Sequence, residues 1–317
     1  GGRGAGAPPS EPVVKEELEL PLELVLEGAA ERVAAPLTLP GPQDKRDKTR
    51  AAPWETRLAH TLVLARSVVA FEVNSGAGDV EVRPSNSGRV EIDARVVARL
   101  DKVKPERLTQ VFEDHVEVSE TKGVLRIKDR HDNEEGWSVH LVVAVPKALP
   151  VHANSGAGDV LVAAGGAKVQ ANSGAGEVRV ELAEARLAFL KANSGAGDVA
   201  VAVGAVSDEL ELNSGAGAVT LLVADPVSPG KADLNSGAGN VRLLVPANWI
   251  GELDLETMST IELPPSFGLQ IERDIAGRSS VRGALGIGGG RYKLRSGAGS
   301  LGVEIGHALP ERKPKKP

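Results

Sequence analysis

The sequence contains no cysteine among its 317 residues, which excludes a disulfide framework and any metal site built on thiolates. Aromatic residues make up only 3% of the chain, so its core must consist mainly of valine, leucine and alanine. No run of 18 apolar residues occurs, and we therefore expect no transmembrane segment. The net charge is −6, and the lack of a basic excess argues against a general nucleic-acid binder.

What the chain does contain is a repeated phrase, Asn-Ser-Gly-Ala-Gly-x-Val, that returns about every 20 residues. From residue 154 to residue 235 the intervals are 18, 21, 20 and 22 residues, and the 60 residues from 235 to 295 predict three further periods. A fixed period of this size predicts a repeat architecture, in which each unit buries its apolar side only by stacking on its neighbours. Copies of the phrase begin at Asn74, Asn154, Asn172, Asn193, Asn213 and Asn235, and a variant copy begins at Arg295.

The residues just before each asparagine alternate as in a half-buried strand. Val169, Gln170 and Ala171 are apolar, polar and apolar, and the other copies follow the same order. Because side chains along a strand point to opposite faces in turn, the apolar residues are predicted to point inward. Continuing this alternation predicts that the asparagine points outward and that the serine and alanine of the phrase point inward.

A second apolar pair follows each asparagine by six and eight residues, as Val178 and Val180 follow Asn172. This pair is out of phase with the first strand, so the chain is predicted to turn a corner between the second glycine and the next residue. Glycine suits this corner because it adopts positive φ without a Cβ clash. The first member of each pair forms the predicted core columns, Val160, Val178, Val199, Val219, Val241 and Leu301.

Stacked coils of this kind lie ~4.8 Å apart, so identical residues form columns. The asparagine amides are predicted to hydrogen-bond along the stack as a structural ladder. Each inward valine or leucine contributes about 1.5–3 kcal/mol on burial, whereas a net hydrogen bond contributes ~1 kcal/mol. Apolar stacking is therefore expected to dominate stability. The predicted ladder residues are Asn74, Asn154, Asn172, Asn193, Asn213 and Asn235.

The chain divides into four predicted parts. Residues 1–55 form an N-terminal extension with a strand at 18–26, whose alternating leucines include Pro21, and a Pro-rich linker. A proline cannot donate to a ladder, so this strand is predicted to be an edge strand. Residues 56–152 are predicted to be opening coils with insertions and one short capping helix, at 105–115. Residues 153–305 form the regular repeats, and 306–317 form a basic tail.

The phrase Ser-Gly-x-Gly-Asp-Val, the strand 139–145 that ends in Val145-Pro146 before a repeat, and the 20-residue spacing resemble a known bacterial group. This is the "putative adhesin" β-strand-repeat family, which includes toast-rack and head-GIN-like domains. The resemblance covers about 56–305 and implies an all-β fold, a single-stranded right-handed parallel β-helix, or β-solenoid, that is often exported. The family implies no catalytic residues, so none carry over to this chain.

The sequence does not match the patterns of calcium, nucleotide, metal or catalytic sites. Gly-x-Gly-Asp is similar to calcium-binding nonapeptide repeats, but those have a nine-residue unit, and Ala218 interrupts the acidic column. The glycine loops are followed by strands instead of helices, so they do not match a nucleotide site. The histidines show no metal-ligand spacing, and no catalytic cluster is evident. We therefore expect no cofactor, no dedicated metal site and no enzymatic activity, and weak surface binding of calcium by these acidic residues is left open.

These observations lead to a functional expectation with alternatives. The chain is expected to be a non-catalytic structural or adhesion-type protein of the bacterial cell envelope, periplasmic or extracellular, with a cytoplasmic location left open. One alternative is a self-assembling scaffold, a homo-oligomer formed through the solenoid ends or through strand 18–26. Another is a carbohydrate-binding rod, for which Trp137 and Trp249 are candidate stacking residues.

Overall fold

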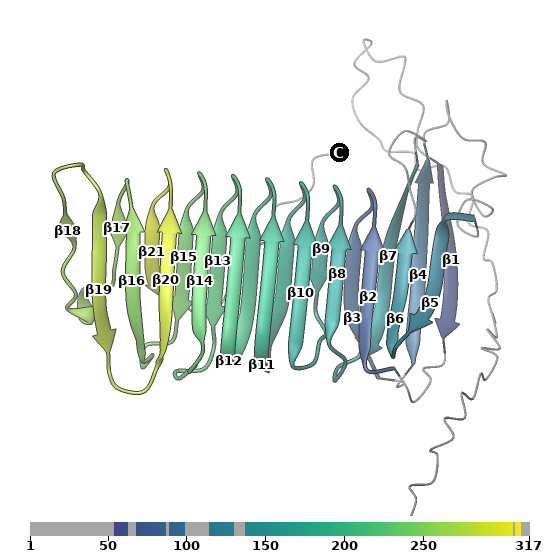
Figure 1. Ribbon diagram of the computed structural model, residues 1–317, viewed down its shortest axis with the longest axis horizontal. Coiled ribbons are helices and arrows are strands. Elements are labelled where there is room, and N and C mark those ends of the chain that lie inside the picture. Colours follow the sequence, from purple (N-terminus) through teal and green to yellow (C-terminus); the bar gives the residue numbers. More distant parts are fainter. Residues whose placement is uncertain are drawn as a thin grey trace, which may run out of the picture.

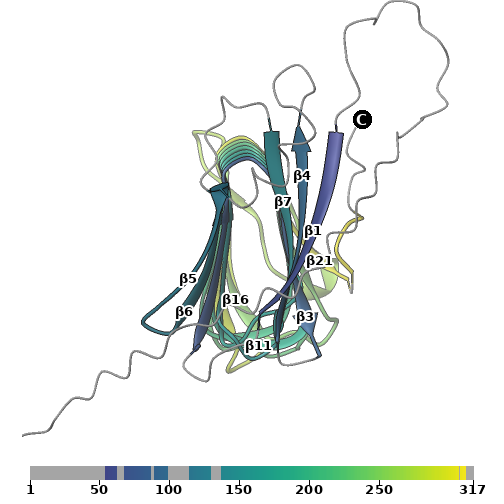
Figure 2. The same ribbon diagram turned by 90° about the vertical axis from the view of Figure 1, so that its right-hand side faces the viewer.

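The computed structural model describes residues 54–62, 68–86, 89–98, 114–129, 137–306 and 308–311. In these residues the protein is all-β, and its strands form one large, mostly parallel sheet that is folded into two walls (Figures 1 and 2). The predicted strand 18–26 and the Pro-rich linker lie outside the described residues. So does the predicted helix 105–115, except for Asp114 and His115 at its end.

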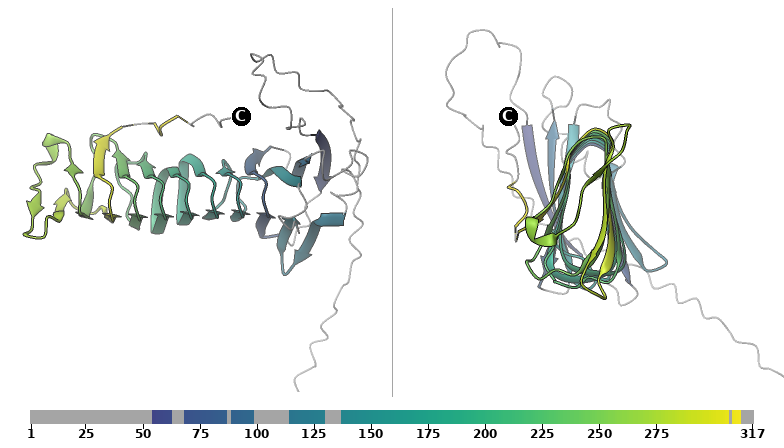
Figure 3. Two further views of the ribbon diagram at one scale, coloured as in Figure 1. Left: turned by 90° about the horizontal axis from the view of Figure 1, so that it is seen from above. Right: turned by 90° about the vertical axis from the view of Figure 1, so that its left-hand side faces the viewer.

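The repeating unit of the fold is a layer, which we define as one strand of the first wall, the corner after it, and the next strand in the second wall. Seen end-on, the corners of successive layers superimpose (Figure 3, right). In spatial order the first three layers are β6 (Val124–Asp129) with β7 (Trp137–Pro146), β2 (Ala70–Ser75) with β3 (Val80–Ser85), and β8 (Val151–Ser155) with β9 (Val160–Val162). The next three share long strands that run through both walls: β10 (Lys168–Ser173) with the first part of β11 (Val178–Ser194), the last part of β11 with the first part of β12 (Val199–Ser214), and the last part of β12 with β13 (Val219–Val223). The last three are β14 (Lys231–Ser236) with β15 (Val241–Val245), β20 (Gly290–Ser296) with β21 (Leu301–Ile305), and β16 (Gly251–Thr257) with β17 (Ile261–Glu262).

The spatial order of the layers differs from their order in the sequence. Asn235 pairs in register with Arg295, so these two residues lie in adjacent layers although 60 residues separate them in the sequence. The prediction of three further periods there is therefore wrong. The β16–β17 layer comes earlier in the chain but stacks beyond β20–β21, as Figure 1 shows. At the other end, Asn74 pairs with Asn154, and β6–β7 stacks on the opposite side of β2–β3. All seven copies of the phrase are thus consecutive in space.

Antiparallel strands complete both ends of the stack. At the end that we call the near end, β5 (Val116–Thr121) pairs with β6, β4 (Val90–Ala98) pairs with β7, and β1 (Trp54–Leu62) pairs with β4. At the opposite, far end, β19 (Ser279–Leu285) pairs with β16, and β18 (Glu272–Arg273) pairs with β19. A single-turn 3-10 helix (Pro265–Phe267) follows β17.

The core lies between the two walls and consists of columns of aliphatic side chains. Leu190, Ala192, Val199 and Val201 are at most 1% exposed, as the predicted alternation requires. The serines of the phrase are also buried. The alanine of the phrase was predicted to point inward, and this is wrong, since Ala196 and most of its counterparts are exposed. The strand alternation ends at the serine, because the chain bends over the whole Gly-Ala-Gly segment and not only after the second glycine.

The segment after β21 packs against the outside of the second wall. Leu309 contacts a small apolar cluster of Ala202, Leu222 and Leu244, which point outward and are at most 7% exposed. Arg179 Nη1 also donates a hydrogen bond to the carbonyl oxygen of Pro310 at 3.1 Å. Part of the predicted basic tail is therefore packed on the sheet. The apolar residues at outward positions were the sequence signal for this contact.

Candidate functional site

The asparagines of the phrase form a continuous ladder on the outside of the first wall. Asn154 Nδ2 donates to Asn74 Oδ1 at 2.6 Å, and each later asparagine donates to the one before it in the same way. The four further bonds measure 2.7–3.1 Å and end at Asn235. Beside Asn235 in the stack lies Arg295, which instead forms an ion pair with Glu256 of the far-end layer at 3.4 Å.

A second ladder, made by the serines, lies inside the corner. Ser194 Oγ donates to the carbonyl oxygen of Gly176 in the neighbouring layer and accepts the N–H of Gly197 in its own layer, both at 2.8 Å. The same pair of bonds recurs at the other serines of the phrase. A buried hydroxyl is costly unless it is hydrogen-bonded, and this arrangement satisfies both its donor and its acceptor.

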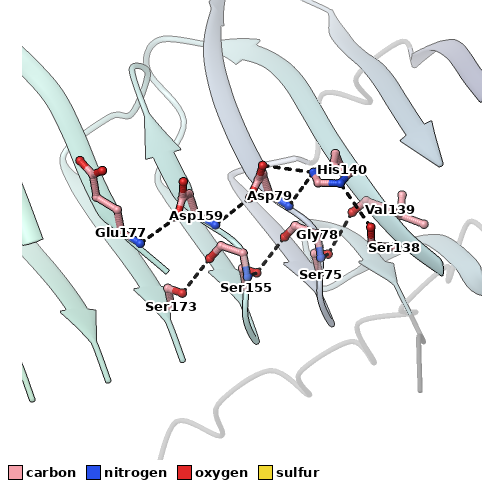
Figure 4. Close-up of polar contacts among 11 residues, drawn as sticks. Ser75, Gly78, Asp79, Ser138, Val139, His140, Ser155, Asp159, Ser173 and Glu177 are labelled. Atoms are coloured by element: carbon pink, nitrogen blue, oxygen red, sulfur yellow. Dashed lines mark hydrogen bonds and ion pairs between the residues drawn. The ribbon is translucent and has the colours of Figure 1, made fainter. Parts of the chain in front are cut away.

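A third ladder starts from the residue after the second glycine. The N–H of Asp159 donates to Asp79 Oδ1, and the N–H of Glu177 donates to Asp159 Oδ1, both at 2.9 Å (Figure 4). Asn240 fills the same role for the N–H of Ser300. These side chains were considered as a calcium column from the sequence. Their oxygens accept backbone amides of the adjacent layer, which gives the acidic residues a structural role at the corner.

The glycines of the corner are explained by close stacking and not by positive φ. None of the phrase glycines in the described residues adopts the left-handed region, contrary to the prediction. A Cβ on Gly195 would lie 2.2 Å from the carbonyl oxygen of Gly174, and a Cβ on Gly197 would lie 2.2 Å from that of Gly176. Any larger residue therefore collides with the backbone of the neighbouring layer.

The third ladder ends at His140 on β7, which stands at the position that Asp79, Asp159 and Glu177 occupy in the next three layers (Figure 4). The N–H of Asp79 donates to His140 Nδ1 at 3.1 Å, and Ser138 Oγ lies 3.3 Å from His140 Nε2. The Asp79 carboxylate lies 3.2 Å from Nδ1. Serine, histidine and aspartate thus occur in the order found in hydrolase triads.

The contacts of this group differ from those of a hydrolase triad. In a Ser-His-Asp triad the aspartate accepts the proton of Nδ1, and Nε2 takes the proton of the serine. Here Nδ1 faces two groups of Asp79, the backbone N–H, which donates to it at 3.1 Å, and the carboxylate at 3.2 Å.

A hollow of about 360 Å³ opens beside His140 on the outside of β3, β4 and β7. Arg83 Nε donates to Glu81 Oε1 within it at 2.6 Å, and this bond raises the pKa of Arg83 above its ordinary value. The hollow is therefore polar and carries charges of both signs, which suits a small polar ligand with several hydroxyl groups. Its lining residues are Asp79, Glu81, Arg83, Asp93, Arg95, His140, Leu141 and Val142.

The outward residue two positions before the asparagine anchors the first ladder in some layers. Glu211 accepts hydrogen bonds from Lys191 at 2.8 Å and from Asn213 at 2.7 Å. The bond from Lys191 holds the pKa of Glu211 below its ordinary value of 4.5. Burial alone would raise the pKa of Glu72. Hydrogen bonds from Arg126 and Asn74 outweigh this effect, so the pKa of Glu72 lies below its ordinary value.

The other sequence candidates have structural positions. The predicted core columns are at most 1% exposed. Trp249 is 5% exposed and packs edge-to-face on Tyr292, with ring centroids 5.0 Å apart, so it is a core residue and not a sugar platform. The side chain of Trp137 lies outside the described residues. Within the described ranges no cluster of three His, Cys, Asp or Glu side chains is placed to hold a metal, and no helix is long and apolar enough to cross a membrane.

Sequence reasoning missed the residues that stand at the serine position in the two end layers. Thr257 stands at the serine position of the far-end layer, and its Oγ1 donates to the carbonyl oxygen of Gly299 at 2.8 Å. Asp129 stands at this position in the near-end layer and accepts the N–H of Gly76 at 3.3 Å. Neither residue lies in a copy of the phrase, so only the spatial order of the layers reveals its position at the corner.

Comparisons with known proteins found similar solved structures only. No protein-family model matches the sequence, and no curated protein matches it. Three similar crystal structures are bacterial. A "putative cell adhesion protein" of Clostridium sporogenes is 10% identical over 80% of this chain and 100% of its own, with a TM-score of 0.35. A "putative adhesin" of Bacteroides fragilis is 9% identical over 78% and 97%, with a TM-score of 0.35. A "putative adhesin" of Parabacteroides merdae is 10% identical over 79% and 96%, with a TM-score of 0.30. The chain is thus similar, at about 10% identity, to bacterial proteins whose descriptions agree with the resemblance drawn from the repeat phrase.

Proposed function

We propose that this protein is a non-catalytic, adhesion-type structural protein of the bacterial cell envelope. In this proposal its layers form a single-stranded right-handed parallel β-helix, a rigid rod that presents a regular surface to a protein or to another surface. The observation that carries the proposal is the uninterrupted stack of seven phrase layers, held by three hydrogen-bond ladders at one corner. Such a stack displays the same backbone and side-chain groups every ~4.8 Å.

The contact surface of the proposed rod is the outside of the first wall. It combines the asparagine ladder with a row of outward residues of mixed charge, which suits polar contacts repeated along an extended partner. That row consists of Glu72, His152, Gln170, Lys191, Glu211, Asp233 and Lys293.

The non-catalytic part of the proposal rests on the group around His140. The backbone N–H of Asp79 donates to Nδ1, the nitrogen that carries the proton in a serine hydrolase, and this contact supports a structural role for His140. We expect the purified protein and its Ser138→Ala variant to give the same background rate with p-nitrophenyl acetate. A rate that Ser138→Ala abolishes would contradict a non-catalytic protein.

Binding and location test the adhesion role directly. We expect saturable binding of the labelled protein to intact bacterial cells or to immobilised peptidoglycan or extracellular-matrix proteins. Lys191→Glu, on the first wall, should weaken this binding, whereas Arg242→Glu, exposed on the second wall, serves as the matched control. Absence of saturable binding to every one of these surfaces contradicts the adhesion role. Recovery of the tagged native gene product only from the cytosol contradicts the envelope location.

The polar hollow favours a second candidate function, binding of a carbohydrate. A sugar uses its hydroxyls as donors and acceptors, and the hollow offers carboxylates, guanidinium groups and an imidazole within one site. A glycan array tests this candidate. We expect a hit that Glu81→Ala removes and that Lys191→Glu leaves in place, and an array without hits rejects it.

A further inference from the structure

The two ends of the stack expose different strand edges. At the far end the outermost strands are β17 and β18, which contain two residues each. Pro264 and Pro265 follow β17 directly, and neither can donate a ladder hydrogen bond. Very short edge strands and prolines are the devices that prevent another strand from pairing. The second-wall edge of the far end is therefore protected against strand addition, whereas on the first wall β18 covers only Ser279 and Ser280 of β19.

The near end exposes a nine-residue edge. β1 pairs with β4 along its whole length, from Trp54 opposite Ala98 to Leu62 opposite Val90, and no strand in the described ranges pairs with its other edge. The partners of Leu58 and His60 on β4 are Ala94 and Ile92, which are buried. Leu58 and His60 are therefore in register with inward positions of the second wall. A strand that added here would continue the same alternation, in which apolar residues suit every second position.

We propose that the segment Leu18–Leu26 of the same chain pairs with the free edge of β1 and closes the near end. The segment has nine residues, as β1 does, and leucine occupies each even position from 18 to 26. This pattern supplies the apolar face that the edge requires. The proposal is independent of the proposed function, since it concerns how the end of the sheet is completed.

Charge favours β1 over β5 as the edge that the segment pairs with, and chain length favours the segment of the same chain. The segment carries Glu19 and Glu23, and β1 carries one charge of each sign, Glu55 and Arg57, whereas the alternative edge, β5, carries Glu117 and Glu120 and no basic residue. The 27 residues from 27 to 53 can extend to ~90 Å, so they connect Leu26 to either end of β1. A covalent connection also raises the effective concentration of the segment at this edge, which favours the segment of the same chain over that of a second copy.

Pro21 fixes which backbone groups of the segment face β1. The N–H groups of a strand point alternately to its two sides, and a proline fits only where its nitrogen faces away from the partner. Because Pro21 is at an odd position, the even residues must direct their N–H groups toward β1. Leu24→Pro therefore removes a pairing donor, whereas Val25→Pro does not.

Hydrogen exchange of β1, followed by mass spectrometry, tests the proposal in the full chain. We expect slow exchange over residues 54–62 in the wild type and in Val25→Pro, and a loss of this slow exchange in Leu24→Pro and in a chain that lacks residues 1–35. Leu24→Ala keeps the N–H and controls for the lost side chain, and it should retain more of the protection than Leu24→Pro. All four altered chains differ from the wild type only in residues 1–35, so the exchange of β8 to β15 reports whether each one is folded.

Three outcomes overturn the proposal. One is fast exchange of half or more of the β1 amides in the wild type, and another is equal protection in Leu24→Pro and Val25→Pro. The third is protection of β1 that falls on dilution, together with a dimer mass in light scattering, which would assign the edge to a second copy of the chain. Concentration-independent protection of a monomer supports pairing within one chain.

Discussion

The seven phrase layers and the two end layers use different residues to make the same corner contacts. In the phrase layers a serine donates to a carbonyl oxygen of the next layer, as Ser194 does. In the far-end layer Thr257 makes this bond without any copy of the phrase around it. In the near-end layer His140 takes the place of the acidic residue and accepts the N–H of Asp79 through Nδ1. What is retained is the hydrogen-bonding role at each position.

The comparison also shows what the glycines of the phrase do. Its glycines are needed where another layer lies directly against the corner, because a Cβ would collide with that layer. The far-end layer is bounded on its outer side by the antiparallel hairpin of β18 and β19, and there the corner reads Met258-Ser259-Thr260. Met258 is 53% exposed. The collisions of the phrase glycines are with the layer on their near-end side, as Gly299 meets Gly239. The far-end layer also has a layer on that side, but its corner is one residue shorter, since Thr257 pairs with Ser296 and Ile261 with Leu301.

The largest expected effect is that of a charge in the middle of the stack. Val199 is 1% exposed and lies in the column that ends at Ile261 in the far-end layer. Val199→Asp buries an unpaired carboxylate and should cost about 4 kcal/mol or more, which unfolds or divides the stack. Ile261→Asp should loosen only the far-end layer. Thermal unfolding with hydrogen exchange measures both, and equal damage to β10–β13 by the two variants contradicts the comparison.

A methyl group at a corner glycine should have the next largest effect. Gly197→Ala places a Cβ 2.2 Å from the carbonyl oxygen of Gly176, so the layers must separate, at a cost of about 3 kcal/mol. Ala196→Ser changes the exposed neighbour and serves as the control, with an expected shift below about 0.5 kcal/mol. Denaturant titration measures both. Equal midpoints for the two variants would show that close stacking does not explain the glycines.

The serine ladder predicts an intermediate effect and a rescue. Ser194→Ala leaves the N–H of Gly197 and the carbonyl oxygen of Gly176 without their partner, which should cost about 1–3 kcal/mol. Ser194→Thr keeps the hydroxyl, as Thr257 does in the far-end layer, and should retain most of the stability. If the melting temperature of Ser194→Thr falls as far as that of Ser194→Ala, the hydroxyl is not the feature that matters.

The asparagine ladder should matter less. Asn193 is half-buried, bonds to Asn172 at 2.7 Å, and can exchange its bonds with water when the ladder is cut. Asn193→Ala should therefore cost about 1 kcal/mol. This is well below the loss expected for Val199→Asp, and calorimetry of the two variants compares them. Equal shifts in melting temperature would reject the ranking of apolar stacking above the ladder.

The smallest expected effect is a pH dependence. Because the pKa of folded Glu211 lies below its ordinary value of 4.5, its bonds to Lys191 and Asn213 stabilise the protein above that pH. The contribution is lost as the pH falls through 4.5 and then through the lower folded value. Glu211→Gln should flatten the stability profile in this acidic range. Parallel profiles for the wild type and Glu211→Gln contradict this assignment.

Much of the layer could be predicted from the sequence, because period-two alternation and a repeated phrase report local geometry. Val178 and Val180 were placed inward on this basis, and a strand was placed at 139–145, where β7 lies. The corner was predicted less well. Glycine serves both positive φ and close approach, and the sequence does not distinguish these two causes.

The order of the layers could not be predicted, because it depends on pairing between segments far apart in the chain. Equal spacing in sequence suggested three coils between Asn235 and Arg295, whereas the structure places these residues side by side. The same limit hid Asp129, Thr257 and His140, whose roles come from the layer that they join. Their residue types differ from the phrase, so no repeat signal marks them.

The layer order can be measured directly with two cysteine pairs, since the chain has no cysteine of its own. Asn235 and Arg295 are register neighbours, at a separation compatible with a disulfide, whereas Glu256 pairs with Arg295 and lies one strand further away. The account predicts that Asn235→Cys with Arg295→Cys forms an intramolecular disulfide under mild oxidation. Asn235→Cys with Glu256→Cys should remain reduced, although it is closer in sequence. The reverse result would contradict the stacking order from which the continuous corner ladders follow.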